Sequence, residues 1–121
     1  MAAKRRRLSR SAEFERVYRQ GRSKANRFLV LHVFPRGEDD AAAGPRLGLS
    51  VSRKVGGAVD RARVKRCLRE AFWAEAERLP AGSDYVVVAR ADARELAERD
   101  GMPGVRTALA ELVDQAGGEA T

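Results

Sequence analysis

The chain has 121 residues, and 24 Lys or Arg against 17 Asp or Glu give it a formal net charge of +7. Its length and an apolar share of 44% are sufficient for one core, so we expect residues 1–121 to form one domain with a basic arm over about 1–8 and a frayed tail over about 117–121. No apolar run approaches the roughly 20 residues of a membrane span, and no signal peptide is predicted. The single cysteine, Cys67, excludes an internal disulfide and a multi-cysteine metal site, and we expect a cytoplasmic protein.

The N-terminal segment predicts a basic arm followed by a short helix. Residues 1–27 contain ten basic side chains and two acidic ones. A helix is expected over about 9–19, where Phe14, Val17 and Tyr18 recur at positions i, i+3 and i+4 and therefore share one face. A cationic segment beside exposed rings is typical of nucleic-acid binding, but rings at this spacing also pack helices onto sheets. Both roles remain open for this helix.

Two strands are predicted next. The segment 28–34 is rich in β-forming residues, and a loop over 36–45 separates it from a second strand over 46–52, which we expect to pair with the first. The second strand alternates an apolar face, Leu47, Leu49 and Val51, with a small polar face, Gly48, Ser50 and Ser52. Such a polar face is either open to water or the floor of a groove for an extended ligand, and the pattern leaves both open.

A long helix over 58–79 is predicted after a Gly-Gly break. Its apolar residues fall on one arc, and a cationic face adjoins that arc with Arg61, Lys65, Arg66 and Arg69. Arg63 points away from this face. Cys67 lies on the apolar arc, so a reactive thiol is not expected.

The last part of the chain predicts a buried strand over 85–89 and a divided helix. The helical segments cover 92–99 and about 104–116, and Gly101 and Pro103 separate them.

The positive charge is concentrated in two segments. Residues 53–69 contain seven basic side chains and one acidic one, so together with residues 1–27 they leave the rest of the chain acidic. Segregated cationic segments favour a polyanionic partner, because each neutralised phosphate releases counterions. The alternative is that these segments are only solvated surface.

Several motifs resemble those of the bacterial ribonuclease P protein component. The resemblance covers about residues 5–115. In chain order the motifs are Arg7-Leu-Ser-Arg10, Asn26-Arg27, Arg46-Leu-Gly-Leu-Ser-Val-Ser-Arg-Lys54, Arg61-Ala-Arg-Val-Lys-Arg66 and Asp84-Tyr-Val-Val-Val-Ala-Arg90. The family motif Arg-Asn-Arg is Arg61-Ala62-Arg63 in this chain, so the polar contact of the family asparagine is missing here.

The resemblance implies an α+β sandwich of element order αβββαβα with a central four-stranded sheet, ribosomal protein S5 domain 2-like. It implies the protein subunit of a ribozyme that removes the 5′ leader from precursor tRNA, with the RNA subunit providing the active site. The implied partners are the catalytic RNA and precursor tRNA, the implied cofactor is Mg²⁺ held mainly by RNA, and the protein is expected to be monomeric without membrane contact.

The resemblance also implies two sites. The RNA-subunit surface would contain Arg53, Lys54, Arg61, Arg63, Lys65, Arg66 and Arg69. The cleft for the precursor leader would contain Arg10, Phe14, Tyr18, His32, Ser50 and Ser52.

No protein catalytic site is predicted. The one histidine and the scattered acidic residues form no recognisable metal-ligand set, so neither a catalytic nor a metal residue is assigned. Two other classes of protein remain alternatives: a ribosomal or assembly protein that binds structured RNA without a role in cleavage, and a DNA-binding regulator. The second is disfavoured, because strands rather than a second helix flank the long helix.

Overall fold

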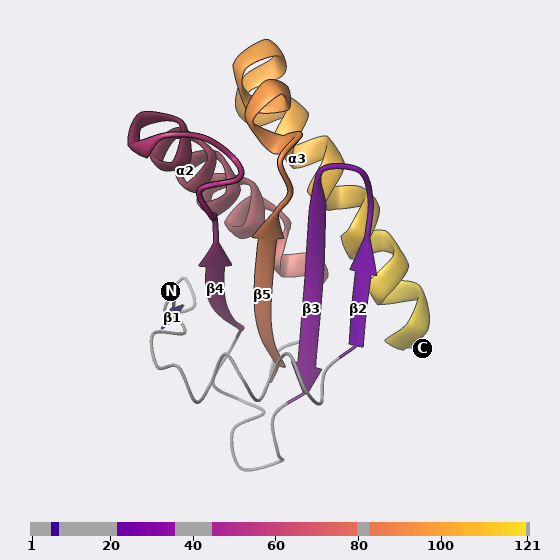
Figure 1. The fold of residues 1–121 in the computed structure, drawn as a ribbon. Helices are drawn as coiled ribbons and strands as arrows, with labels where there is room; N and C mark the ends of the chain where they lie inside the picture. Colours follow the sequence, from indigo (N-terminus) through magenta and orange to yellow (C-terminus); the bar gives the residue numbers. More distant parts are fainter. Residues whose placement is uncertain (1–5, 8–21, 36–44, 80–82, 121) are drawn as a thin grey trace.

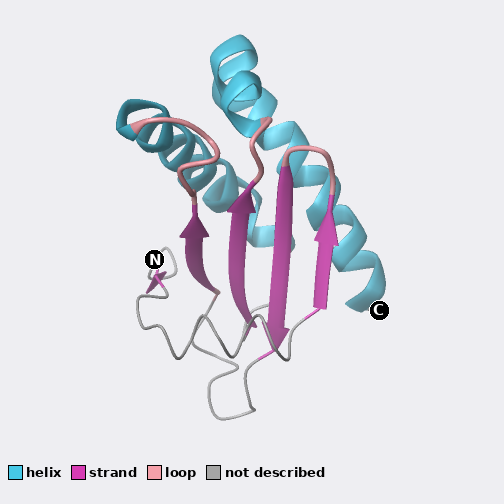
Figure 2. Cartoon of the chain, viewed as in Figure 1, coloured by secondary structure: helices cyan, strands magenta, loops and turns pink. Residues whose placement is uncertain are grey.

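A mixed β-sheet with two helices on one face makes up the described part of the chain (Figures 1 and 2). The structure is a computed structural model and describes residues 6–7, 22–35, 45–79 and 83–120. The elements are β1 (Arg6–Arg7), β2 (Arg22–Ala25), β3 (Leu29–Pro35), β4 (Arg46–Ser50), α2 (Ala58–Glu75), the 3₁₀ turn η2 (Ala76–Arg78), β5 (Ser83–Ala89) and α3 (Ala93–Ala120). The helix predicted over about 9–19 lies outside the described residues.

The strand order corrects one expectation. The sheet runs β1-β4-β5-β3-β2, so β4 does not pair with β3 as predicted; β5 lies between them, parallel to β4 and antiparallel to β3. The composition of β5 fits this place, because its continuous apolar run Tyr85-Val-Val-Val88 is better shielded between two strands than at a solvent-exposed edge of the sheet. The connection from β4 to β5 is the long helix α2, as a parallel pair requires.

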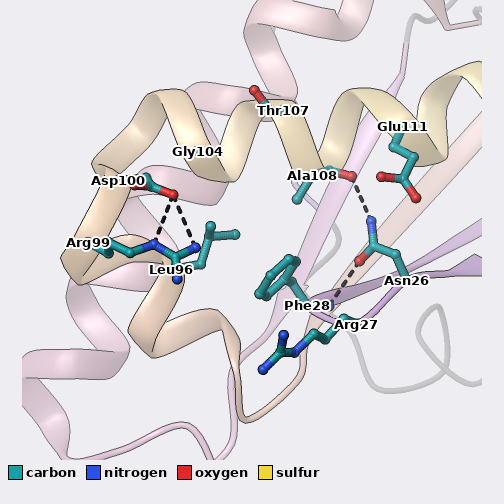
Figure 3. A pocket seen from close by; sticks show the side chains of 10 residues that line it. All are labelled: Asn26, Arg27, Phe28, Leu96, Arg99, Asp100, Gly104, Thr107, Ala108 and Glu111. Carbon is teal, nitrogen blue, oxygen red and sulfur yellow. Dashed lines mark hydrogen bonds and ion pairs between the residues drawn. The ribbon is translucent and has the colours of Figure 1, made fainter.

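Strand β2 was not predicted from the local residue pattern. Its sequence Arg-Ser-Lys-Ala has no β signature, and it forms by antiparallel pairing with β3 across a tight turn. Asn26 holds that turn, because its Oδ1 accepts hydrogen bonds from the backbone N–H groups of Phe28 and Leu29. Its Nδ2 donates to the carbonyl oxygen of Ala108 in α3 at 2.9 Å, which joins the hairpin to the helix layer (Figure 3).

The two helices follow the predicted divisions closely. Helix α2 ends at Glu75, and η2 continues the predicted segment to Arg78. Helix α3 changes direction at Gly101, whose φ of 63° is unfavourable for other residues, which confirms the predicted division. It then continues to Ala120, past the predicted end near residue 116. Within the described segments, no helix combines the length and apolar character needed to cross a membrane.

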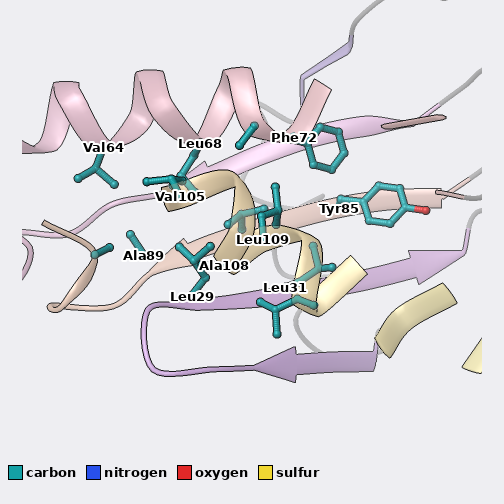
Figure 4. Close-up of a cluster of buried hydrophobic side chains, with 14 of the residues drawn as sticks. Leu29, Leu31, Val64, Leu68, Phe72, Tyr85, Ala89, Val105, Ala108 and Leu109 are labelled. Atoms are coloured by element: carbon teal, nitrogen blue, oxygen red, sulfur yellow. The ribbon is translucent and has the colours of Figure 1, made fainter. Parts of the chain in front are cut away.

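The main core lies between the sheet and the two helices (Figure 4). Leu31 of β3 and Tyr85 of β5 are fully buried there with Leu68 and Phe72 of α2 and Leu109 of α3. Leu47 and Leu49 of β4 stand beside Tyr85 and Val87 on this face. The prediction that residues 46–52 present an apolar face to the core is therefore confirmed for β4.

Candidate nucleic-acid interface

The outer side of α2 carries a row of cations. Arg61, Lys65 and Arg69 follow one another at four-residue spacing, so they lie about 6 Å apart along the helix axis. Lys65, Arg66 and Arg69 are exposed, whereas Val64 and Leu68 on the opposite side are buried in the core. Burial of the apolar arc thus fixes the rotation of α2 and directs these cations to solvent.

Arg61 differs from the other cations in this row. It is half-buried, and its Nε is the one buried side-chain nitrogen or oxygen in the described part of the chain that has no hydrogen-bond partner. A buried donor without an acceptor costs about 1–3 kcal/mol.

Arg53 and Lys54 extend the cationic surface beyond the helix. They are exposed in a turn between β4 and α2, and this turn is anchored by the buried side chain of Val55. The hydroxyl of Ser52 accepts a hydrogen bond from the backbone N–H of Lys54 at 3.3 Å. The turn ends at Gly56, whose φ is 156° and where a Cβ would lie 2.7 Å from Oδ2 of Asp60. These local constraints hold the two cations beside the first turn of α2.

Arg63 is separated from the rest of the predicted RNA-subunit surface. It lies on the flank of α2 that faces α3, where its Nη1 is 3.7 Å from Oε1 of Glu98. On the same flank, Oδ2 of Asp60 lies 3.8 Å from Nη1 of Arg94. The structure therefore brings together Arg53, Lys54, Arg61, Lys65, Arg66 and Arg69, and it places Arg63 in contact with an acidic side chain.

The sheet face away from α2 and α3 contains two of the residues predicted for the leader cleft. His32 stands beside Val86, and Ser50 stands beside Val88, so both point to this face. Phe34, Val86 and Val88 form a second, small apolar cluster there. Desolvation by burial lowers the pKa of His32, which favours the neutral imidazole near pH 7.

The structure places Ser52 away from this face, and it does not describe the remaining predicted cleft residues. Ser52 lies beyond the end of β4, where it is exposed and caps the turn described above. Arg10, Phe14 and Tyr18 lie outside the described residues.

An ion pair that the sequence reasoning missed lies at the edge of the same sheet face. Arg46 donates from Nε and Nη2 to the two carboxylate oxygens of Asp84, both at 2.7 Å. Asp84 is completely buried, so this bidentate contact compensates for a desolvated charge. The opposite charges of Arg46 and Asp84 predict this ion pair only when β4 and β5 are already known to be neighbouring strands.

A cleft of about 380 Å³ lies between the β2–β3 turn and the kinked helix α3 (Figure 3). Phe28, Leu96 and Ala108 provide apolar lining, and Arg27 and Arg99 stand at its rim. Arg27 is hydrogen-bonded to Asp92 at 2.8 Å, and Arg99 to Asp100 at 3.2 Å. Because both guanidinium groups face carboxylates, this cleft is electrostatically less suited to phosphate than the outer side of α2.

The described residues offer no ready metal or thiol chemistry. No group of three or more His, Cys, Asp or Glu side chains among them could hold a metal ion. Burial raises the pKa of the Cys67 thiol, with a smaller contribution from Glu70, so the protonated form dominates at neutral pH.

Comparison with known proteins identifies the family. The family model described as Ribonuclease P matches residues 2–114. The chain belongs to the ribonuclease P protein family. It is 42% identical over 113 residues to the ribonuclease P protein component of Shouchella clausii, which covers 93% of this chain and 87% of that protein.

Two solved ribonuclease P proteins have the same fold. The Staphylococcus aureus protein is 32% identical with a TM-score of 0.79, over 93% of this chain and 96% of that one. The Thermotoga maritima protein is 33% identical with a TM-score of 0.78, over 92% and 97% of the two chains. These similarities confirm the predicted family and the α+β fold class, and they make this chain a ribonucleoprotein component associated with the endoribonuclease activity of ribonuclease P.

Proposed function

We propose that this protein is the RNA-binding subunit of a bacterial ribonuclease P, which removes the 5′ leader of precursor tRNA by endonucleolytic hydrolysis. It would bind the catalytic RNA through α2 and the preceding turn, as a monomer in the cytoplasm. The observation that carries the proposal is the cationic outer side of α2, where Lys65, Arg66 and Arg69 are exposed, in a chain of this family. Phosphates attract such a surface, and release of their counterions drives binding.

The sheet face with His32 and Ser50 is the proposed contact for the precursor leader. Both residues stand on the face that the two described helices do not cover, beside an apolar cluster suited to nucleobases. Arg10, Phe14 and Tyr18 of the N-terminal segment would complete this contact, and Ser52, in the turn after β4, would meet the leader only beyond the end of the strand. Aromatic rings in a positive groove hold single-stranded RNA, at about 1–3 kcal/mol for each stacked base.

Catalysis is assigned to the RNA subunit. Mg²⁺ would be held mainly by that RNA and by the substrate. This protein would then position the precursor, and its cations would lower the electrostatic repulsion between the catalytic RNA and the precursor tRNA.

Reconstitution tests the proposal. The purified protein, mixed with the ribonuclease P RNA subunit and a precursor tRNA at low magnesium, is expected to produce the mature 5′ end faster than the RNA alone. Binding to structured RNA without any acceleration of cleavage would instead indicate a ribosomal or RNA-assembly protein.

A further inference from the structure

Two ion pairs with opposite charge order join α2 to the first part of α3. In one pair α2 supplies the cation, since Nη1 of Arg63 lies 3.7 Å from Oε1 of Glu98. In the other pair α2 supplies the anion, since Oδ2 of Asp60 lies 3.8 Å from Nη1 of Arg94. The two pairs have similar lengths and join the same two helices. They differ in the charge that α2 contributes: breaking the first pair frees a cation on α2, and breaking the second frees an anion.

The pair between Arg63 and Glu98 is accessible to a competing anion. The side chain of Arg63 is 41% exposed and that of Glu98 is 45% exposed. Exposed pairs of this kind are weak and are screened by salt, so an RNA phosphate can compete for the same guanidinium group.

The surroundings of this pair are also acidic. Helix α3 contains six Asp or Glu residues against three Arg residues. A phosphate that approaches Arg63 therefore meets a carboxylate from α3, whereas one that approaches Lys65 or Arg69 meets the outer side of α2.

We propose that Glu98 is an intramolecular competitor of RNA for Arg63 and sets the border of the RNA-subunit surface between α2 and α3. The inference rests on the proposed function, because it concerns the same surface. Glu98 is a positioning residue in this scheme, since it acts on RNA through Arg63. Its effect is to keep the affinity of the protein for its RNA below the value that a free Arg63 would produce.

The test is a double-mutant cycle read as affinity for the ribonuclease P RNA subunit in a filter-binding titration at low salt. Glu98→Gln is expected to tighten binding about two- to fivefold, the range expected for one exposed ion pair. The same substitution in an Arg63→Gln background is expected to leave the affinity unchanged. A purely structural role of Glu98 would not produce this dependence on Arg63.

Two matched variants separate the proposal from its alternatives. Arg94→Gln breaks the companion pair but frees a carboxylate, so it should not tighten binding; equal tightening by Arg94→Gln would indicate loosened helix packing instead. Glu95→Gln makes the same change of net charge, but Glu95 is paired within α3, with Nη1 of Arg99 at 4.0 Å. It should therefore change affinity less than Glu98→Gln.

Four results from the variants would overturn the inference. They are an unchanged or weakened affinity in Glu98→Gln, an equal gain in Glu95→Gln, an equal gain in Arg94→Gln, and a gain that persists without Arg63. A wild-type protein that does not bind the RNA subunit would overturn the proposed function and this inference together. Wild-type binding with an unresponsive Glu98→Gln variant would overturn only the inference.

Discussion

Arg106 of α3 holds the buried carboxylate of Glu75 at the end of α2, with its Nε and Nη2 both 3.1 Å from Oε2. Arg78 of η2 contacts the other oxygen of the same carboxylate. Arg78 also pairs with Asp114 of α3. These contacts fix the end of α2 to the second segment of α3.

Glu75→Gln should destabilise the domain. The side chain of Glu75 is only 6% exposed, and the substitution removes the charge that compensates two guanidinium groups. We expect the free energy of unfolding to fall by about 1.5–3 kcal/mol, the range for hydrogen bonds to charged groups. Urea denaturation measures the change. Glu70→Gln, at an exposed position of the same helix, should remain within about 0.5 kcal/mol of the wild type.

His32 should make the domain less stable in mild acid. Burial lowers its pKa below the ordinary value of 6.5, so the unfolded chain binds the proton more readily than the folded one. The free energy of unfolding is therefore expected to fall as the pH drops through and below 6.5, and to be fully retained above it. Denaturation of wild type and His32→Tyr at a series of pH values measures the contribution. Because the chain has one histidine, an NMR titration with a midpoint at or above 6.5 would contradict this explanation.

Replacement of Lys65 and Arg69 by Gln should weaken binding to the RNA subunit and reduce its salt dependence. Both side chains are exposed on the outer side of α2. If each contacts one phosphate, the slope of log K against log salt should flatten by about 1.4–1.8. Filter-binding titrations at several salt concentrations provide the slope. An unchanged slope in a folded double variant would remove these residues from the RNA-subunit surface.

Ala62→Asn should strengthen assembly with the RNA subunit. Ala62 is exposed among the cations of α2, at the position where the family motif has asparagine. One added hydrogen bond would contribute about 0.5–1.5 kcal/mol, and we expect the lower part of this range at an exposed site. The same binding titration gives the value. A loss of affinity would mean that the neighbouring side chains are adapted to alanine.

Ser50→Trp should weaken binding of precursor tRNA without affecting mature tRNA. Ser50 points to the sheet face proposed for the leader, and an indole there would occupy the space of a base. We expect a loss comparable to that of one stacked base, about 1–3 kcal/mol, with Tyr18→Ala producing a similar selective loss. The loss is measured by comparing the affinities of wild-type and variant holoenzymes for precursor tRNA and for mature tRNA.

Thermal denaturation is the control for these two variants, because a misfolded protein would weaken both tRNA complexes equally. If folded Ser50→Trp and Tyr18→Ala holoenzymes still discriminate precursor from mature tRNA like the wild type, the leader contact is assigned to the wrong face.

Local residue patterns predicted most of the described helices and strands, but they predicted neither β1 and β2 nor which strands lie next to each other. The alternation of Leu47, Gly48, Leu49 and Ser50 predicts two different faces because each side chain in a strand faces opposite to the next. It does not reveal that β5 enters between β3 and β4, since that depends on contacts far apart in the chain.

In the candidate site, too, local properties could be predicted from the sequence and contacts between distant residues could not. Helical spacing alone placed Arg63 away from Arg61, Lys65 and Arg69, because rotation about a helix axis is a local property. Its contact with Glu98, 35 residues later, depends on how α3 packs against α2 and could not be predicted from either helix.

The central position of β5 determines when this protein can fold during synthesis. Strands β3 and β4 share no direct pairing, so the two halves of the sheet stay unconnected until residues 83–89 have left the ribosome. The β2–β3 turn depends on an even later event, because Nδ2 of Asn26 bonds to a carbonyl 82 residues downstream. Distant contacts of this kind slow folding. The two cationic segments, residues 1–27 and 53–69, are therefore synthesised before the acidic last helix against which α2 packs.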